Sequence, residues 1–161
     1  MSGFELADLL KEKETAFERR AECLAAMGSL YRRLFSREGF ERIAFKYWTP
    51  LTQPFGQEAD DLERPDRERL REAMFKTLKG ILSQPARSSF LSAANGLLLL
   101  RHPQGPEAMR QELAARPGAP AADRAFVEAC MEGRSQPCPF PSRQEKGGLL
   151  GLAWLKVIAG H

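Results

Sequence analysis

Apolar residues that recur every seven positions dominate the first part of the chain. The residues that keep this spacing are Leu10, Phe17, Leu24 and Tyr31. At 3.6 residues per turn, residues seven positions apart lie on the same side of an α-helix. The sequence therefore predicts one long N-terminal helix that runs to about Ser36 and buries one of its sides.

Two cations interrupt this apolar stripe. In a helix, Lys13 and Arg20 lie on the same side as the apolar Phe17. A charged side chain is costly to bury unless it has a partner. We therefore expect this half of the helix to be partly exposed or to contact a polar group.

Further amphipathic segments follow the first helix. Apolar positions at helical spacing predict helices over residues 40–48, 65–83, 90–101, 106–116 and 121–132. The segment 90–101 is apolar on nearly all sides, which is typical of a helix in the centre of a core. We expect it to pack against the first helix and the 65–83 helix.

Proline and glycine mark the segments that we do not expect to be regular. Two prolines and a glycine predict an irregular loop over residues 49–64. Three prolines predict an extended linker over residues 133–146, because proline cannot donate a backbone hydrogen bond. The apolar residues 149–159 predict a buried C-terminal helix.

Size and composition favour one folded domain. The chain has 161 residues, of which 43% are hydrophobic and 28% are charged. These values are typical of a globular domain and unlike those of a disordered chain. The sequence thus predicts an all-α, single-domain bundle over residues 1–161, with about six helices.

The cysteines and the apolar stretches indicate the compartment. Cys23, Cys130 and Cys138 form no CxxC pair, which argues against a zinc site or a disulfide framework. The N-terminus has no apolar signal-peptide core, and no apolar stretch approaches the roughly 20 residues that span a bilayer. We expect a cytoplasmic protein without a membrane span.

The sequence contains none of the usual catalytic motifs. Its two histidines are His102, which precedes a proline at a predicted helix end, and His161. General acid–base and nucleophilic catalysis depend most often on a histidine beside a partner group. We therefore expect no enzymatic activity, no catalytic residue and no cofactor.

An acidic cluster precedes the predicted 65–83 helix. Its members are Glu58, Asp60, Asp61 and Glu63. Clustered carboxylates can hold a divalent cation, but the spacing matches no EF-hand loop. Acidic residues also stabilise the positive end of a helix. We interpret the cluster in this second way and predict no metal site.

A basic array accompanies the first two predicted helices. Arg19, Arg33 and Arg37 lie opposite the apolar stripe, and Arg42 and Lys46 follow on the next helix. Such an array can follow a phosphate backbone, and the mild net charge of +3 permits this function without requiring it. A solvated helix face has the same appearance, and nearby glutamates weaken the field of the array.

Aromatic residues provide an alternative contact surface. Tyr47 and Trp48 lie among cations on the second predicted helix, and Phe55 and Trp154 lie farther along the chain. Tyrosine and tryptophan contribute much of the binding energy at protein interfaces. We expect these residues to contact a partner protein, although Tyr47 and Trp48 also fit a helix face that packs into the core.

The tetrapeptide Gln53-Pro54-Phe55-Gly56, in a predicted loop before a helix, resembles a feature of the small helical subunits of CRISPR effector complexes. The likeness covers this tetrapeptide and the general size class of the chain. It implies a non-catalytic subunit that supports nucleic acid within a larger complex.

The sequence thus predicts a non-enzymatic accessory or scaffold subunit that docks onto a protein partner in a multi-subunit complex. The alternative hypothesis is a helical subunit of a nucleoprotein complex that binds the phosphate backbone of nucleic acid. Self-association is compatible with both hypotheses.

Overall fold

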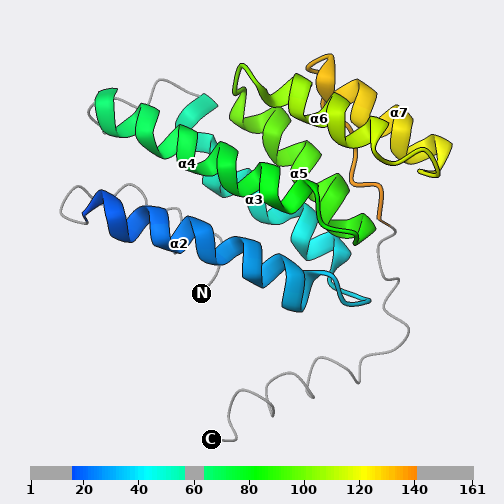
Figure 1. The fold of residues 1–161 in the computed structure, drawn as a ribbon, viewed down its shortest axis with the longest axis horizontal. Helices are drawn as coiled ribbons and strands as arrows, with labels where there is room; N and C mark the ends of the chain where they lie inside the picture. Colours follow the sequence, from blue (N-terminus) through cyan, green and yellow to red (C-terminus); the bar gives the residue numbers. More distant parts are fainter. Residues whose placement is uncertain (1–15, 57–63, 141–161) are drawn as a thin grey trace, which may run out of the picture.

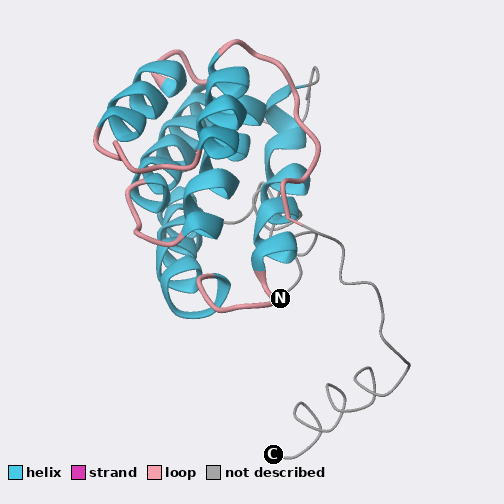
Figure 2. Cartoon of the chain, turned by 90° about the vertical axis from the view of Figure 1, so that its right-hand side faces the viewer, coloured by secondary structure: helices cyan, strands magenta, loops and turns pink. Residues whose placement is uncertain are grey.

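All regular elements in the described part of the chain are helices. The computed structural model describes residues 16–56 and 64–140, which contain six α-helices and one π-helix (Figures 1 and 2). In chain order these are α2 (Phe17–Leu30), η1 (Tyr31–Phe35), α3 (Glu41–Gly56), α4 (Arg64–Leu82), α5 (Arg87–Leu100), α6 (Gly105–Ala114) and α7 (Ala121–Met131). The predicted all-α bundle is confirmed.

The N-terminal helix ends differently from the sequence prediction. α2 continues directly into the π-helix η1, whose wider turn is closed by the Ser36 amide, which donates to the Tyr31 carbonyl at 3.0 Å. The helical residues from Phe17 to Phe35 agree with the prediction. The part of the predicted long helix before residue 16 lies outside the described residues.

Arg20 has the polar contact that the sequence predicts. Its side chain is buried on the α4 side of α2, and its guanidinium lies 3.0 Å from the Asp66 carboxylate. Leu24 and Tyr31 are completely buried on the same side of the helix. The stripe is therefore a core-facing surface with one ion pair near its start, because a buried guanidinium requires an anionic partner.

α5 occupies the centre of the bundle, as its apolar sequence predicts. Every residue from Ser88 to Leu97 is buried. α3 and α4 pack along α5, and α6 and α7 cover its remaining side (Figures 1 and 2). A helix covered from several directions cannot have a polar face, and this explains its almost uniform composition of leucine, alanine, serine and glycine.

Buried hydroxyl groups of η1 and α5 donate hydrogen bonds to backbone carbonyls of neighbouring helices. Tyr31 donates to the Ala44 carbonyl at 2.6 Å, and the Ser92 hydroxyl donates to the same carbonyl at 2.6 Å. Ser88 donates to the Phe35 carbonyl at the end of η1 at 2.9 Å. Burial raises the pKa of Tyr31 well above its usual range, so the phenol keeps its proton and remains a donor.

The predicted loop over residues 49–64 is wrong for its first half, because α3 continues to Gly56. An internal proline costs a helix about 3 kcal/mol. Continuing the helix past Pro50 buries Leu51 completely, and burial of a leucine contributes roughly 1.5–3 kcal/mol. The Thr52 hydroxyl also donates to the Trp48 carbonyl at 2.9 Å. Residues 57–63 lie outside the described part.

The predicted linker over residues 133–146 is non-helical as far as it is described, but it is not a free linker. Residues 134–138 have no regular structure, and Phe140 is buried with its ring centroid 6.2 Å from that of Phe45. The ring centroid of Phe126 lies 5.8 Å from that of Phe45. An aromatic anchor therefore fixes this segment to the bundle. Residues 141–146 and the predicted 149–159 helix lie outside the described residues.

Gly96 of α5 lies in close contact with side chains of both α3 and α4. A Cβ atom added there would lie 2.5 Å from Leu78 Cδ2 and 3.0 Å from Trp48 Cγ, both of which belong to completely buried side chains. Gly80 is also in a helix interior, but it has open space around it.

We predict opposite effects of alanine at these two glycines. Gly96→Ala should lower the free energy of unfolding by about 1–2 kcal/mol, because overpacking outweighs the better helix propensity of alanine. Gly80→Ala should raise it by about 0.5–1 kcal/mol through propensity alone. Urea denaturation of both variants measures these changes. Equal effects at the two positions would contradict the close packing at Gly96.

Candidate functional site

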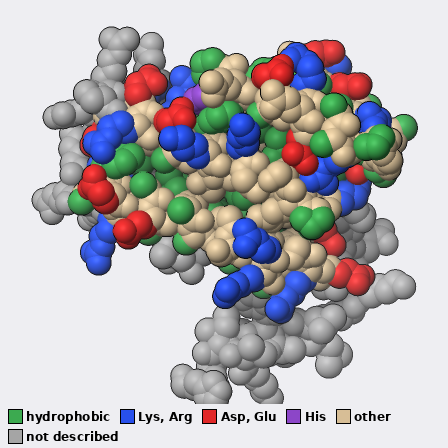
Figure 3. Space-filling model, viewed as in Figure 1, with side chains coloured by type: hydrophobic (Ala, Val, Ile, Leu, Met, Phe, Trp, Pro, Cys, Tyr) green, Lys and Arg blue, Asp and Glu red, His purple; other side chains and the backbone are tan. Residues whose placement is uncertain are grey.

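Cations gather around the turn that joins η1 to α3. We define the basic patch by the following residues: Arg32, Arg33, Arg37, Arg42 and Lys46. All are exposed except Arg42, which is half-buried. Figure 3 shows basic side chains gathered where α2 ends in Figure 1. Four of the five residues predicted as nucleic-acid contacts thus lie near one turn of the chain.

Arg19, the fifth predicted contact, lies apart from this patch. It is exposed near the start of α2. At 1.5 Å per residue, it is about 20 Å along the helix axis from Arg33. Exposed side chains between the two include Glu22 and Ser29. The array predicted from sequence is therefore a compact patch with one distant outlier.

The core packing of η1 determines which of its side chains face outward. Tyr31 and Phe35 are buried with their rings in an edge-to-face contact at 4.9 Å between centroids. Arg32 and Arg33 lie between these anchors in the chain and are therefore directed to the surface. Sequence spacing alone does not indicate the π-helix that presents them.

The cations of the basic patch differ from six other arginines of the bundle in having no carboxylate partner in the described part of the chain. Within the described residues, no carboxylate forms an ion pair with any member of the patch. Six arginines elsewhere are paired with carboxylates, as the following contacts show: Arg20–Asp66, Arg69–Glu18, Arg87–Asp123, Arg110–Glu107, Arg116–Glu112 and Arg134–Glu132. The patch therefore keeps its positive charge available to an external anion.

Carboxylates near the patch weaken its field only in part. Glu18, which the sequence places close to the array, forms an ion pair across to α4 with Arg69 at 3.6 Å. The Glu41 carboxylate accepts a hydrogen bond from the Gly39 amide at 2.9 Å. Glu38 remains exposed in the same turn. The local net charge is positive, because the five cations of the patch outnumber Glu38 and Glu41, the two carboxylates of the turn.

A hollow of about 630 Å³ lies beside the patch. Arg42 and Arg87 line it, together with Glu38 and Glu41. Arg87 forms a two-point hydrogen-bonded pair with Asp123 at 2.7 and 2.6 Å, which raises the pKa of the guanidinium. Acidic and basic side chains both line this hollow, so its lining is not specific for anions.

One of the four aromatic residues predicted as protein contacts lies in the core. Trp48 is 0% exposed and stacks on Tyr31 at 6.1 Å, so it belongs to the core and cannot form a surface contact. Tyr47 is half-buried and packs on Phe35 at 5.4 Å. The side chain of Phe55 and all of Trp154 lie outside the described residues.

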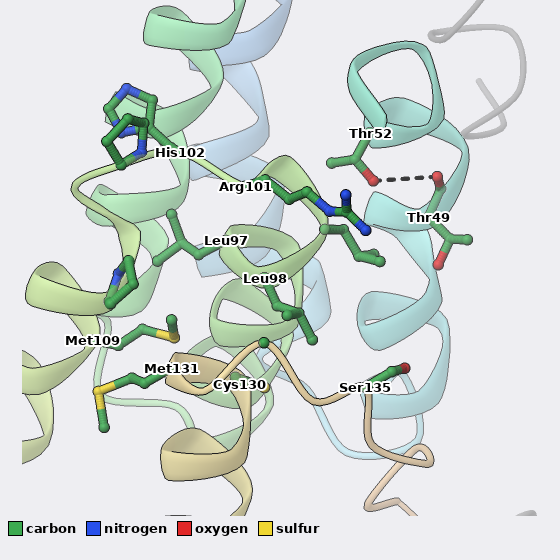
Figure 4. Close-up of a pocket in the computed structure, with 14 residues that line it drawn as sticks. Thr49, Thr52, Leu97, Leu98, Arg101, His102, Met109, Cys130, Met131 and Ser135 are labelled. Carbon is green, nitrogen blue, oxygen red and sulfur yellow. Dashed lines mark hydrogen bonds between the residues drawn. The ribbon is translucent and has the colours of Figure 1, made fainter. Parts of the chain in front are cut away.

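A second hollow, which we call the α3–α7 pocket, was not indicated by the sequence. Its volume is about 600 Å³, and residues of α3, α5, α6 and α7 line it (Figure 4). Leu98, Met109 and Met131 form much of its apolar wall, and Thr49 stands at its polar edge. Its size and mostly apolar lining are typical of ligand pockets.

Arg101 stands at the mouth of this pocket in an unusual backbone conformation. Its φ of 51° places it in the left-handed region, and it is the C-cap of α5. The Arg71 guanidinium donates to the Arg101 carbonyl. Figure 4 shows the Arg101 side chain directed across the pocket toward Thr49 and Thr52.

His102 has a structural environment. Its ring stacks on Phe75 at 4.0 Å with an angle of 11° between the planes. Nε2 lies 3.2 Å from a Glu72 carboxylate oxygen, and Nδ1 accepts from the Gln104 amide at 3.3 Å. Both ring nitrogens therefore have protein partners and hold the start of the α5–α6 connection.

The described residues contain neither a metal-binding cluster nor a helix that could span a membrane. In that part of the chain, no group of three or more histidine, cysteine, aspartate or glutamate side chains could hold a metal ion. The predicted acidic cluster from Glu58 to Glu63 lies outside it. None of the described helices has the length and apolar character needed to span a bilayer.

Cys130 lies at the inner side of the α3–α7 pocket and should be chemically inert. Burial raises the pKa of its thiol to about 12. At pH 8 we expect iodoacetamide to modify Cys130 at least about 100-fold more slowly than the half-buried Cys138, because the thiolate is the nucleophile. Peptide mass spectrometry measures both rates, and full reactivity in urea is the control. Equal rates in the native protein would contradict this burial.

The same pKa shift predicts a loss of stability at alkaline pH. The folded state favours the neutral thiol of Cys130, so its contribution is complete below the ordinary thiol pKa. It should be lost as the pH rises from about 9 toward 12. Cys130→Ala should reduce that part of the alkaline destabilisation in urea titrations.

Comparison of the chain with protein-family models, curated proteins and solved structures found no match. The tetrapeptide from Gln53 to Gly56, which resembles a feature of CRISPR small subunits, lies in the last turns of α3 and not in a loop before a helix.

Proposed function

We propose that this protein is a non-enzymatic helical subunit that binds the phosphate backbone of nucleic acid through the basic patch. The observation that carries the proposal is the set of exposed cations around one turn that lack ion-pair partners among the described residues. Phosphate groups can replace the missing carboxylates, and release of condensed counterions then favours binding.

Backbone contact explains this surface better than recognition of bases. The available donors are flexible arginine and lysine side chains around a turn between helices. The aromatic rings that could stack on bases are used inside the bundle, where Trp48 packs on Tyr31. The patch is therefore suited to sequence-independent binding.

Arg19 provides a second cationic contact for nucleic acid, near the start of α2. The exposed side of α2 leads from Arg33 to Arg19 over about 20 Å. A strand with 3.4 Å per nucleotide would cover this distance with about six nucleotides. We infer that a nucleic acid strand of this length bridges the patch and Arg19 along α2.

The basic patch gives a direct mutational test. Arg33→Ala/Arg37→Ala should weaken binding of a fluorescein-labelled single-stranded 20-mer about 10-fold in fluorescence anisotropy at 50 mM salt. The slope of log K against log salt should fall by about 1.4, since each lost phosphate contact removes roughly 0.7 for a single strand.

Arg110→Ala/Arg134→Ala is the matched control. It removes the same charge from exposed sites on α6 and after α7, where both arginines already have glutamate partners. This variant should retain the parent affinity and salt slope. Binding that is insensitive to salt, or an equal loss in both double variants, would contradict the proposal.

Our second proposal is that the protein docks onto a protein partner. Burial of Trp48 removes one of the aromatic residues on which that prediction was based, while Tyr47 is half-buried and the side chain of Phe55 and all of Trp154 lie outside the described residues. The observation that favours docking is instead the α3–α7 pocket, which is built from elements other than α2 and η1.

A further inference from the structure

We propose that the α3–α7 pocket binds an extended, acidic peptide segment of a partner protein. An apolar side chain of that peptide would enter between Leu98, Met109 and Met131. A neighbouring carboxylate of the peptide would pair with Arg101. This inference is independent of nucleic-acid binding at the basic patch.

The apolar wall of the pocket can accept a large side chain. Met109 is buried at its base, while Leu98 and Met131 are half-buried along its sides. Methionine side chains are unbranched and polarizable, so they adapt to partners of different shape. Removing these partly exposed surfaces from water provides the driving force for binding.

The charge of the pocket selects an anionic partner. Of the lining residues, Arg101 carries a permanent positive charge, and it forms no ion pair with another described residue. His102, which also lines the pocket, has its Nε2 directed at Glu72. Arg101 is exposed, so a carboxylate that reaches it would form a charge-assisted hydrogen bond beside the apolar surface of the pocket.

The segment after α7 explains why the partner should be an extended peptide. Gly133 and Ser135 line the pocket, and residues 134–138 have no regular structure. Among the described residues, neither the N–H nor the C=O of Ser135 has a hydrogen-bond partner. An extended peptide could pair with these backbone groups while its side chains enter the pocket.

The backbone at Arg101 provides a variant that separates binding from folding. The left-handed conformation at a helix C-terminus is normally adopted by glycine, and other residues occupy it at a cost. Arg101→Gly should therefore keep or raise the melting temperature. At the same time it removes the guanidinium that the proposed carboxylate requires.

Methyl NMR of the full chain labelled at methionine tests the proposal. The probe is a blocked heptapeptide of alternating leucine and glutamate, compared with the same peptide in which lysine replaces glutamate. We expect saturable shifts of the Met109 and Met131 methyl signals with the glutamate peptide. Its affinity should exceed that of the lysine peptide at least about 10-fold.

Two substitutions at Arg101 and one control complete the test. Arg101→Gly should weaken binding of the glutamate peptide about 10-fold. Arg101→Glu should reverse the preference, so that the lysine peptide binds more tightly than the glutamate peptide. Lys79→Ala removes an exposed cation of α4 that does not line the pocket, and it should leave both affinities unchanged.

Several results would overturn the proposal. They include no saturable shift of the two methyl signals, equal affinity for both peptides, and insensitivity of binding to Arg101→Gly. Methyl shifts that change with protein concentration alone would assign the pocket to a second copy of the chain. Contacts between these methyls and residues 149–158 in the free protein would assign it to the chain itself.

Discussion

The close approach of α3 to α5 at Gly96 is the contact on which the rest of the structure depends. Because Gly96 has no side chain, the Trp48 ring reaches the α5 backbone and becomes completely buried. Trp48 then provides the surface on which Tyr31 stacks, and Tyr31 in turn contacts Phe35. This continuous series of buried rings fixes the π-helix η1 against the core. The orientation of Arg32 and Arg33 in the basic patch is therefore a consequence of core packing, because these two arginines occupy the side of η1 that the rings leave exposed.

Buried hydroxyl groups make this arrangement specific. An apolar contact between helices tolerates small rotations, whereas a buried hydroxyl must find an acceptor at a defined place. Tyr31 and Ser92 converge on the Ala44 carbonyl, and Ser88 binds the Phe35 carbonyl where the π-helix ends. These hydrogen bonds join η1, α3 and α5 at defined positions. The sequence shows the serines of α5, but their partners are set by helix packing and not by local spacing.

The sequence predicted helices well wherever apolar spacing and burial agreed. It missed the second half of α3, because Pro50 is a strong local signal for a helix end while burial of Leu51 is a tertiary effect. The sequence did not distinguish a core position from an interface position for Trp48, since an apolar helix face is suited to both. Arg33, Arg37 and Lys46 are exposed, whereas Arg42 is half-buried. The lack of partners in the patch depends on pairs such as Arg69–Glu18 that form between helices. Nothing in the local sequence indicates the left-handed conformation of Arg101 or the pocket beside it.

The two proposed surfaces would allow one small bundle to hold a nucleic acid and a protein partner at the same time. The basic patch belongs to η1, the following turn and the start of α3, while the α3–α7 pocket belongs mainly to the ends of α5 and α7. The central claim is that nucleic acid contacts the first of these surfaces. Photo-crosslinking of the full chain to a single-stranded RNA containing 4-thiouridine, followed by identification of the crosslinked peptides, tests it most directly. The account predicts crosslinks concentrated within residues 19–46, and crosslinks concentrated on α6 and α7 or spread evenly over the chain would contradict it.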